Sequence, residues 1–360
     1  MGKKRNLGSI PTVGVWLVAF ALVLGACGGA NIEDDPDPGS TTTATPAPSD
    51  GSTTGSSVAE GEDNLKRDLV VAYSAVPQLA YSASRTAWRE MNKQGWEIEE
   101  LFLPQNELAI QALEQGEVDL VPTSTLTGMI AINQGADIVG IVAAARGEWV
   151  LVGAENVETP ADLEGKRIAV HSETSVSNLV VEHSLSKEGI NAEVVMIPGS
   201  PARAQALTQG EVDATSLFIS DALRLEADAD MPINIVANYA DLPFIDQMLF
   251  VRRSFLTEHR GEAEAVVKGL LDTYRRFQED PAWGALQANL LLPETPVALA
   301  ERVVEVHNEI GVWSPTGGVA DYDDFAETIA FLKSAELLPV DASDDPTAFI
   351  DLDILDSVRG

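Results

Sequence analysis

The sequence has few of the residues that build disulfides, metal centres and nucleic-acid surfaces. It holds one cysteine and four scattered histidines, which excludes an internal disulfide and argues against a zinc site. Only 23 lysines and arginines stand against 56 acidic residues, for a formal net charge of −33. Such a chain repels phosphates and lacks a polybasic membrane patch. We therefore expect no metal, no cofactor and no nucleic-acid partner, and we attribute the charge to solubility.

The apolar run near the start of the chain is too short to cross a membrane. It covers residues 13–24 and follows basic residues 3–5, as in a signal peptide. Residues 24–27, Leu-Gly-Ala-Cys, resemble a bacterial lipobox. The resemblance implies cleavage before Cys27 and a diacylglycerol on its sulfur; an ordinary secretory signal is the alternative. We expect residues 1–26 to be removed and the mature protein to be extracytoplasmic, anchored to the cell membrane through Cys27.

The segment after this cysteine lacks the residues that make a core. Residues 28–62 contain Gly, Ser, Thr, Pro, Asp and Glu but no Leu, Met, Phe, Tyr or Trp. Such a composition cannot bury enough apolar surface to offset the entropy of ordering. We expect residues 27–66 to be a lipidated, disordered tether with a reach on the order of 30 Å.

A nine-residue repeat organises the rest of the chain. Residues 111–119 read Gln-Ala-Leu-Glu-Gln-Gly-Glu-Val-Asp, and residues 205–213 repeat them with one change, Thr208 in place of Glu114. Each copy begins with strong helix formers, places a glycine where a helix ends, and continues into a short apolar run. Each copy is therefore the second half of a strand–helix–strand unit. The repeat predicts two lobes of the same α/β build.

Strands and helices alternate through the body of the chain, which predicts mainly parallel sheets covered by helices. Strands are expected at residues 69–73, 96–103, 119–122, 138–144, 168–170, 194–197, 212–215 and 233–237. The apolar runs at 148–153 and 248–251 have no helix before them and are interpreted as strands that cross between lobes. Helical periodicity follows at 263–278, 296–310 and 322–333. The predicted fold is α/β, with two Rossmann-like lobes joined by two crossing strands and a helical C-terminal tail.

Several of these segments resemble one family. Residues 162–170, Asp-Leu-Glu-Gly-Lys-Arg-Ile-Ala-Val, are similar to a turn and strand of type II solute-binding proteins, and both Gly-Glu-Val-Asp copies look like that family's paired markers. Over residues 69–337 the chain most resembles the nitrate, sulfonate and taurine binding proteins and their thiamine-pyrimidine relatives. Residues 216–221 depart from the Trp-Glu-Pro type of segment often found there.

The resemblance implies a type II periplasmic binding fold that holds a small molecule between its lobes and delivers it to an ABC permease and ATPase. Lobe 1 is then expected at residues 67–149 plus 248–360, and lobe 2 at residues 150–247. We expect a monomer. No enzyme is expected, because the synthases among the relatives carry a cysteine-rich segment that this chain lacks, and no nucleophile motif appears.

Polar residues after the predicted strands are the candidate ligand contacts, because open α/β sheets bind ligands beyond the carboxyl ends of their strands. The candidates are Ser74, Thr123, Ser124, His171, Thr174, Ser175, Ser216 and, before the return strand, Asp246. Most lead into helix N-termini, which favour negative charge. No arginine lies plainly in these loops; Arg146 and Arg85 are the nearest. Trp88 and Trp149 are expected in the core.

Two ligand classes remain open at this point. Hydroxyls and helix N-termini favour a small anion such as a sulfonate, taurine, nitrate or carboxylate. The missing arginine leaves a neutral or heteroaromatic nitrogen compound, such as a thiamine pyrimidine precursor, with Glu148, Asp221 and Asp246 as acceptors. A ligand sensor that does not take part in transport is a further alternative, because the sequence does not distinguish sensing from import.

Overall fold

The computed structural model describes residues 65–66, 68–228, 234–240 and 242–359. The predicted signal peptide, the predicted lipid site at Cys27 and residues 28–64 of the predicted tether lie outside these residues. No helix of the described part is both long and apolar enough to span a bilayer.

The strands of the first lobe lie in the order β2-β1-β3-β10-β4, as a two-stranded sheet and a three-stranded sheet joined by one bridge. These strands are β1 (Asp68–Tyr73), β2 (Glu97–Phe102), β3 (Val121–Ser124), β4 (Ile138–Ala145) and β10 (Gln247–Arg252). β1 is parallel to β2, and β10 lies antiparallel between β3 and β4. A bridge between Val71 and Leu120 joins β1 to the chain just before β3. Four strands therefore come from one stretch of chain, and the antiparallel strand comes from far along it.

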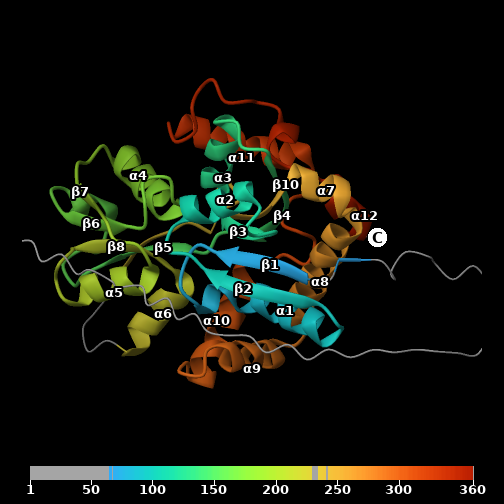
Figure 1. Cartoon of the computed structure of the whole chain (residues 1–360). Helices are drawn as coiled ribbons and strands as arrows, with labels where there is room; N and C mark the ends of the chain where they lie inside the picture. The colour runs from blue at the N-terminus through green and yellow to red at the C-terminus, as the bar shows by residue number, and fades with distance from the viewer. Residues whose placement is uncertain (1–64, 67, 229–233, 241, 360) are drawn as a thin grey trace, which may run out of the picture. The chain divides into compact units, whose positions relative to one another are not determined.

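The sheet of the second lobe repeats this order as β7-β6-β8-β5-β9. Its strands are β5 (Trp149–Gly153), β6 (Arg167–Val170), β7 (Glu193–Met196), β8 (Ala214–Phe218) and β9 (Asn234–Asn238). β6 is parallel to β7 and β8, whereas β5 is antiparallel to β8 and β9. β5 follows the strands of the first lobe in the chain but pairs with β8 and β9 of the second. β10 follows the strands of the second lobe but pairs with β3 and β4 of the first. The predicted crossing strands and the two-lobe fold are therefore confirmed (Figure 1).

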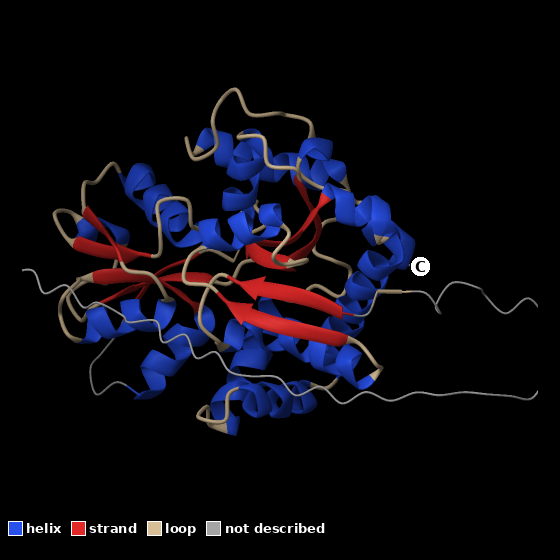
Figure 2. Cartoon of the chain, in the orientation of Figure 1, coloured by secondary structure: helices blue, strands red, loops and turns tan. Residues whose placement is uncertain are grey.

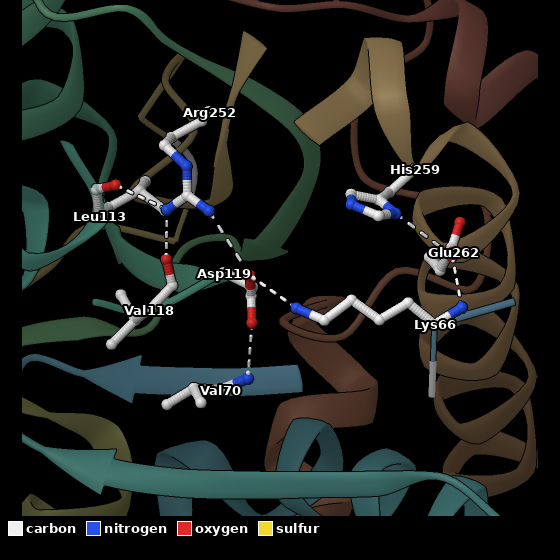
Figure 3. A network of polar contacts seen from close by, with 8 residues as sticks. All are labelled: Lys66, Val70, Leu113, Val118, Asp119, Arg252, His259 and Glu262. Carbon is white, nitrogen blue, oxygen red and sulfur yellow. Dashed lines mark hydrogen bonds and ion pairs between the residues drawn. The ribbon is translucent and has the colours of Figure 1, made fainter. Parts of the chain in front are cut away.

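The aspartate that ends each copy of the repeat makes the same kind of contact in both lobes. Asp119 accepts the backbone N–H of Val70 in β1 over 3.0 Å and forms ion pairs with Arg252 at 3.5 Å and Lys66 at 3.7 Å (Figure 3). Asp213 accepts the N–H of Arg167 in β6 over 2.9 Å. β1 and β6 hold equivalent places in the strand orders of the two lobes, so each aspartate bonds to the equivalent strand of its own lobe. The last residue of the repeat therefore makes the same backbone contact in both lobes.

Helices flank the strands of both lobes (Figure 2). The first lobe contributes η1 (Leu79–Tyr81), α1 (Ser82–Lys93), α2 (Asn106–Gln115) and α3 (Thr125–Asn133), and the second contributes η2 (Pro160–Leu163), α4 (Val176–Glu188), α5 (Ser200–Thr208) and α6 (Ile219–Asp228). α2 ends at Gly116 with φ 75°, a left-handed conformation that glycine adopts without steric cost.

The C-terminal region is helical, as predicted. It comprises α7 (Arg253–Glu258), α8 (Arg260–Glu279), α9 (Pro281–Leu291), α10 (Val297–Ile310), α11 (Tyr322–Ser334), η3 (Pro346–Ala348) and α12 (Asp353–Arg359). α8 and α9 pack on α1 of the first lobe, whereas α10 reaches α6 of the second. Val306 and Ile310 accordingly pack against the apolar cluster of the second lobe. α10 therefore contacts both lobes.

Candidate functional site

Both lobes line a small cavity at the ends of their strands. Ser74, Ala75, Tyr81, Asn106 and Ser124 come from the first lobe, and His171, Ser175, Val176, Ser200, Arg203 and Phe218 from the second; Trp149 and Gln247 begin the crossing strands β5 and β10. The cavity measures about 30 Å³, room for on the order of two water molecules. Four predicted site residues, Ser74, Ser124, His171 and Ser175, come together here.

Three helices begin at the cavity wall. Ser124 and Ser175 cap α3 and α4, where their hydroxyls accept the N–H groups of Thr127 and Asn178 over 3.4 Å in both cases. Ser200 is the first residue of α5. Free N–H groups and the positive ends of the helix dipoles therefore meet at one place. Such an arrangement favours an anion.

A buried arginine supplies the positive charge that the sequence analysis did not find. Arg203 in α5 is 1% exposed and donates to the carbonyls of Ser216 over 3.0 Å and Ile197 over 3.3 Å. Burial lowers its pKa to about 10 against the opposing charge of Asp221, so it remains charged at neutral pH. The guanidinium therefore lines the cavity as a buried cation.

Arg85 and Arg146, the arginines expected nearest the site, bind partners away from the cavity. Arg85 pairs with Glu100 at 2.8 Å, and Arg146 donates to the carbonyl of Gly318 over 2.9 Å. Arg203 was missed because the end of β7 was not counted among the strand-end loops. Pro201 lies in the first turn of α5, two residues before Arg203. A proline there marks a helix N-terminus at this strand end, and this is the sequence signal for Arg203.

Two further donors at the cavity have no partner. Gly199 donates its backbone N–H to Nδ1 of His171 over 3.0 Å, which leaves the ring proton on Nε2. Burial and then the charge of Arg203 lower the pKa of His171 to about 4, so the ring is neutral above that pH. Neither His171 Nε2 nor Trp149 Nε1 has a hydrogen-bond partner, although both are buried. Buried donors without partners are rare in native proteins and indicate a missing acceptor.

Trp149 belongs to the hydrophobic core, as expected, and it also lines the cavity. Its ring packs on Phe218 with centroids 4.3 Å apart, and Tyr81 meets Phe218 edge-on at 6.3 Å. These rings form an apolar wall opposite the polar groups. Trp88 is a core residue, as expected: it is 1% exposed and donates to the hydroxyl of Tyr73 over 2.7 Å.

The other predicted site residues lie around the cavity without lining it. Thr123 Oγ1 donates to Ser74 Oγ at 3.2 Å and Asn106 Oδ1 at 3.1 Å, behind the wall. Ser216, expected in a loop, lies inside β8 because the strand begins two residues later than predicted, and its hydroxyl is buried without a partner. Asp246 is fully buried just before β10.

Thr174 bridges the two lobes instead. Its hydroxyl donates to Oε1 of Glu107 in α2 over 2.5 Å and lies 3.3 Å from the hydroxyl of Thr127 in α3. Ser172 reaches the same Glu107 oxygen over 3.4 Å. The residues joined by these bonds are 47 to 67 positions apart in the sequence and lie on different lobes, so the bridge forms only when the lobes are together.

The chain matches the NMT1/THI5-like family model over residues 92–283, just over half of its length. The chain belongs to the NMT1/THI5-like family. Comparison of this NMT1/THI5-like chain with curated proteins gives no match.

Solved structures similar to the NMT1/THI5-like chain show its fold. The alkanesulfonate-binding protein SsuA of Xanthomonas axonopodis pv. citri, bound to MOPS, is 20% identical with a TM-score of 0.64, covering 79% of this chain and 98% of that one. The periplasmic nitrate-binding protein NrtA of Synechocystis PCC 6803 is 8% identical with a TM-score of 0.65, covering 81% and 88%. A Candida albicans protein described as having the generic periplasmic binding protein fold is 15% identical with a TM-score of 0.62, covering 79% and 96%. The predicted fold and family resemblance are confirmed.

Proposed function

We propose that this protein is the solute-binding component of an ABC importer and captures a small anion, such as a sulfonate, taurine or nitrate, between its lobes. The observation that carries the proposal is the group of donors at the cavity. Arg203 is a buried cation, and within the described residues His171 Nε2 and Trp149 Nε1 have no hydrogen-bond partner. An oxyanion with several acceptor oxygens matches this set, and charge-assisted hydrogen bonds are the strong ones. Similar structures described as sulfonate-binding and nitrate-binding support it.

Capture requires the lobes to move. A cavity of about 30 Å³ is too small for a sulfonate, so the ligand enters a more open form, and the lobes close on it to a cavity larger than the present one. We propose lobe 1 at residues 67–149 plus 248–360 and lobe 2 at residues 150–247, with β5 and β10 as the hinge. Ligand favours the closed form only through its higher affinity for that form.

The alternative ligand, a neutral or heteroaromatic nitrogen compound, needs acceptors at the cavity. The three carboxyls considered for that role, Glu148, Asp221 and Asp246, do not line it. This favours the anion. A sensing role uses the same geometry, and an adjacent permease and ATPase in the genome would favour import over sensing.

The rest of the proposal concerns where the protein works. We propose that Cys27 carries the lipid and holds the protein on the extracytoplasmic face of the cell membrane, with the permease and ATPase as partners and the protein as a monomer. Binding without catalysis is proposed, because the donors at the cavity hold an anion and no activated nucleophile accompanies them.

Isothermal titration tests the ligand. We expect propane-1-sulfonate, taurine or nitrate to bind and an aminopyrimidine to give no heat. Binding of the aminopyrimidine alone, abolished by Asp246→Asn, would overturn the anion. Sulfonate buffers are avoided, because they would compete for the site.

A further inference from the structure

Three buried acids and one buried arginine surround the cavity. Glu148 and Asp246 are 0% exposed, and Asp221 is 7% exposed. Glu148 directly precedes Trp149, and Asp246 directly precedes Gln247, so both acids adjoin residues that line the cavity. The buried cation beside them is the guanidinium of Arg203. An anion in the cavity would repel each of these acids that is ionised, in a region of low dielectric constant.

Glu148 and Asp246 form a pair across the two connections between the lobes. The backbone N–H of Glu148 donates to Oδ2 of Asp246 over 3.3 Å. Neither side-chain oxygen of Glu148, nor Oδ1 of Asp246, has a hydrogen-bond partner. Glu148 precedes β5, and Asp246 precedes β10, the two crossing strands. The pair therefore lies at the hinge beside the cavity.

Among the described groups that face this pair, Arg146 is the charged base, and burial outweighs its effect on the pKa of Asp246. His307 of α10 brings Nε2 to 3.4 Å from Oε1 of Glu148, but burial lowers the pKa of His307 to about 3 and leaves the ring uncharged at neutral pH. Tyr274 of α8 donates its hydroxyl to the carbonyl of Ala144 over 2.8 Å. The remaining facing groups are Tyr81 of η1, Asp221 of α6 and Arg146, which follows β4.

A bound cation is not indicated as the source of compensation. The described residues contain no group of three or more His, Cys, Asp or Glu side chains placed to hold a metal. Arg146 already donates to Gly318 and lies 3.8 Å from Asp324. The buried pair is therefore left with protons as its means of becoming neutral, since an unpaired buried carboxylate is very costly.

We propose that anion capture is coupled to uptake of one proton by the Glu148–Asp246 pair. The inference rests on the proposed function, because it needs an anionic ligand. The protein, one anion and one proton from solvent form a complex in which the negative charge of the ligand replaces that of a carboxylate. The net charge of the buried region then stays unchanged, and Arg203 is free to balance the ligand.

The acidities of the two groups agree with this coupling. Burial raises the pKa of Asp246 to about 7, and burial together with the charges of Asp246 and Asp221 raises the pKa of Glu148 well above its usual range. Without ligand, Asp246 therefore loses its proton as the pH rises through about 7. A nearby anion raises that pKa further, so binding above pH 7 takes up a proton.

The dissociation constant for propane-1-sulfonate and for nitrate, measured by titration calorimetry from pH 6 to pH 9, tests the coupling. We expect it to be nearly constant at low pH and to rise about tenfold per pH unit above pH 7. Asp246→Asn, a neutral side chain of the same shape, should lose this rise and bind more tightly than wild type at pH 9. Glu148→Gln should likewise reduce the rise of the dissociation constant with pH and tighten binding at pH 9. Glu114→Gln, at an exposed position of α2, should behave as wild type.

A second measurement needs no variant. Calorimetry at pH 8 in Tris and in imidazole, which differ in ionisation enthalpy, gives the number of protons taken up per anion; we expect about one. Anion binding with no proton uptake and the same affinity at pH 6 and pH 9 would overturn the inference and leave the proposed function standing. If none of the anions binds at any pH, the proposed function fails, and the coupling fails with it.

Discussion

Glu148 and Asp246 touch through a hydrogen bond from the backbone N–H of Glu148 to Oδ2 of Asp246, over 3.3 Å, although 98 positions separate them in the sequence. Each stands at the start of a crossing strand, so the contact joins the two connections between the lobes. A buried acid at such a place affects the stability of the protein as well as its affinity for ligand.

Replacing Asp246 with asparagine should stabilise the protein at neutral pH. Its pKa is about 7 in the folded protein and about 3.9 when unfolded, so wild type loses stability as the pH rises from about 4 to about 7. A pKa difference of about three units corresponds to a loss of at most about 4 kcal/mol in the free energy of unfolding of wild type. Asp246→Asn should not show this loss. Urea unfolding at pH 4.5, 6 and 8 measures this. If the unfolding free energies of Asp246→Asn and wild type differ by the same amount at all three pH values, the prediction is wrong.

Replacing Arg203 should abolish tight anion binding. The guanidinium is the buried cation of the cavity, and losing a charge-assisted hydrogen bond of about 3 kcal/mol lowers affinity about 100-fold. Arg203→Lys keeps the charge but cannot hold Ser216 and a ligand together, so it should lose most of the affinity. Arg167→Gln, at an exposed strand position, is the matched control. Titration calorimetry gives the affinities, and unaltered binding by Arg203→Gln would exclude the site.

Removing the hydroxyl of Thr174 should favour the open form. Thr174→Val loses the bond to Glu107 that joins the lobes and should weaken ligand binding about tenfold, since a hydrogen bond to a charged group contributes at least about 1.5 kcal/mol. Small-angle scattering should show a larger radius of gyration than wild type at the same ligand concentration. Thr257→Val, in exposed α7, should change neither quantity. Equal affinities of the two variants would argue against the bridge.

Alanine at Gly147 should destabilise the crossing segment. Gly147 has φ +61°, and a Cβ there would lie 2.9 Å from backbone atoms of Ala240. The left-handed conformation alone costs a residue with a side chain about 1–2 kcal/mol, and the clash adds to it. Gly189 has φ +66° with nothing within 4 Å of its Cβ position, so Gly189→Ala isolates the conformational cost. Thermal unfolding should rank wild type, Gly189→Ala and Gly147→Ala in that order, and a reversed order of the variants would contradict the clash.

The anchoring prediction uses the single cysteine. Cys27→Ser removes the only thiol that a diacylglycerol could modify, so the protein should move from the membrane fraction to the soluble extracytoplasmic fraction. Fractionation of cells and metabolic labelling with a fatty acid measure this. A variant that stays with the membrane and keeps the label would rule out lipidation at Cys27.

The sequence by itself determined the two-lobe fold, because the features behind it are local. Hydrophobic periodicity, the glycine stops and the repeat ending at Asp119 and Asp213 belong to short segments, and they predicted two lobes and the crossing strands. Strand limits were less accurate: β3 and β8 begin two residues later than expected, so Ser216 is a strand residue. The Gly-Glu-Val-Asp turn takes up the intervening residues.

The site was decided by the tertiary structure. Ser124 and Ser175 were predictable because caps depend on a few neighbouring residues. Arg203 and Trp149 were not, since an arginine in a helix and a tryptophan in a strand look the same in sequence whether they face solvent, core or cavity. Only the packing of two lobes around β5 and β10 brings these side chains together, buries them and leaves Trp149 Nε1 without an acceptor. Burial of this kind depends on contacts between residues far apart in the chain, which no local pattern encodes.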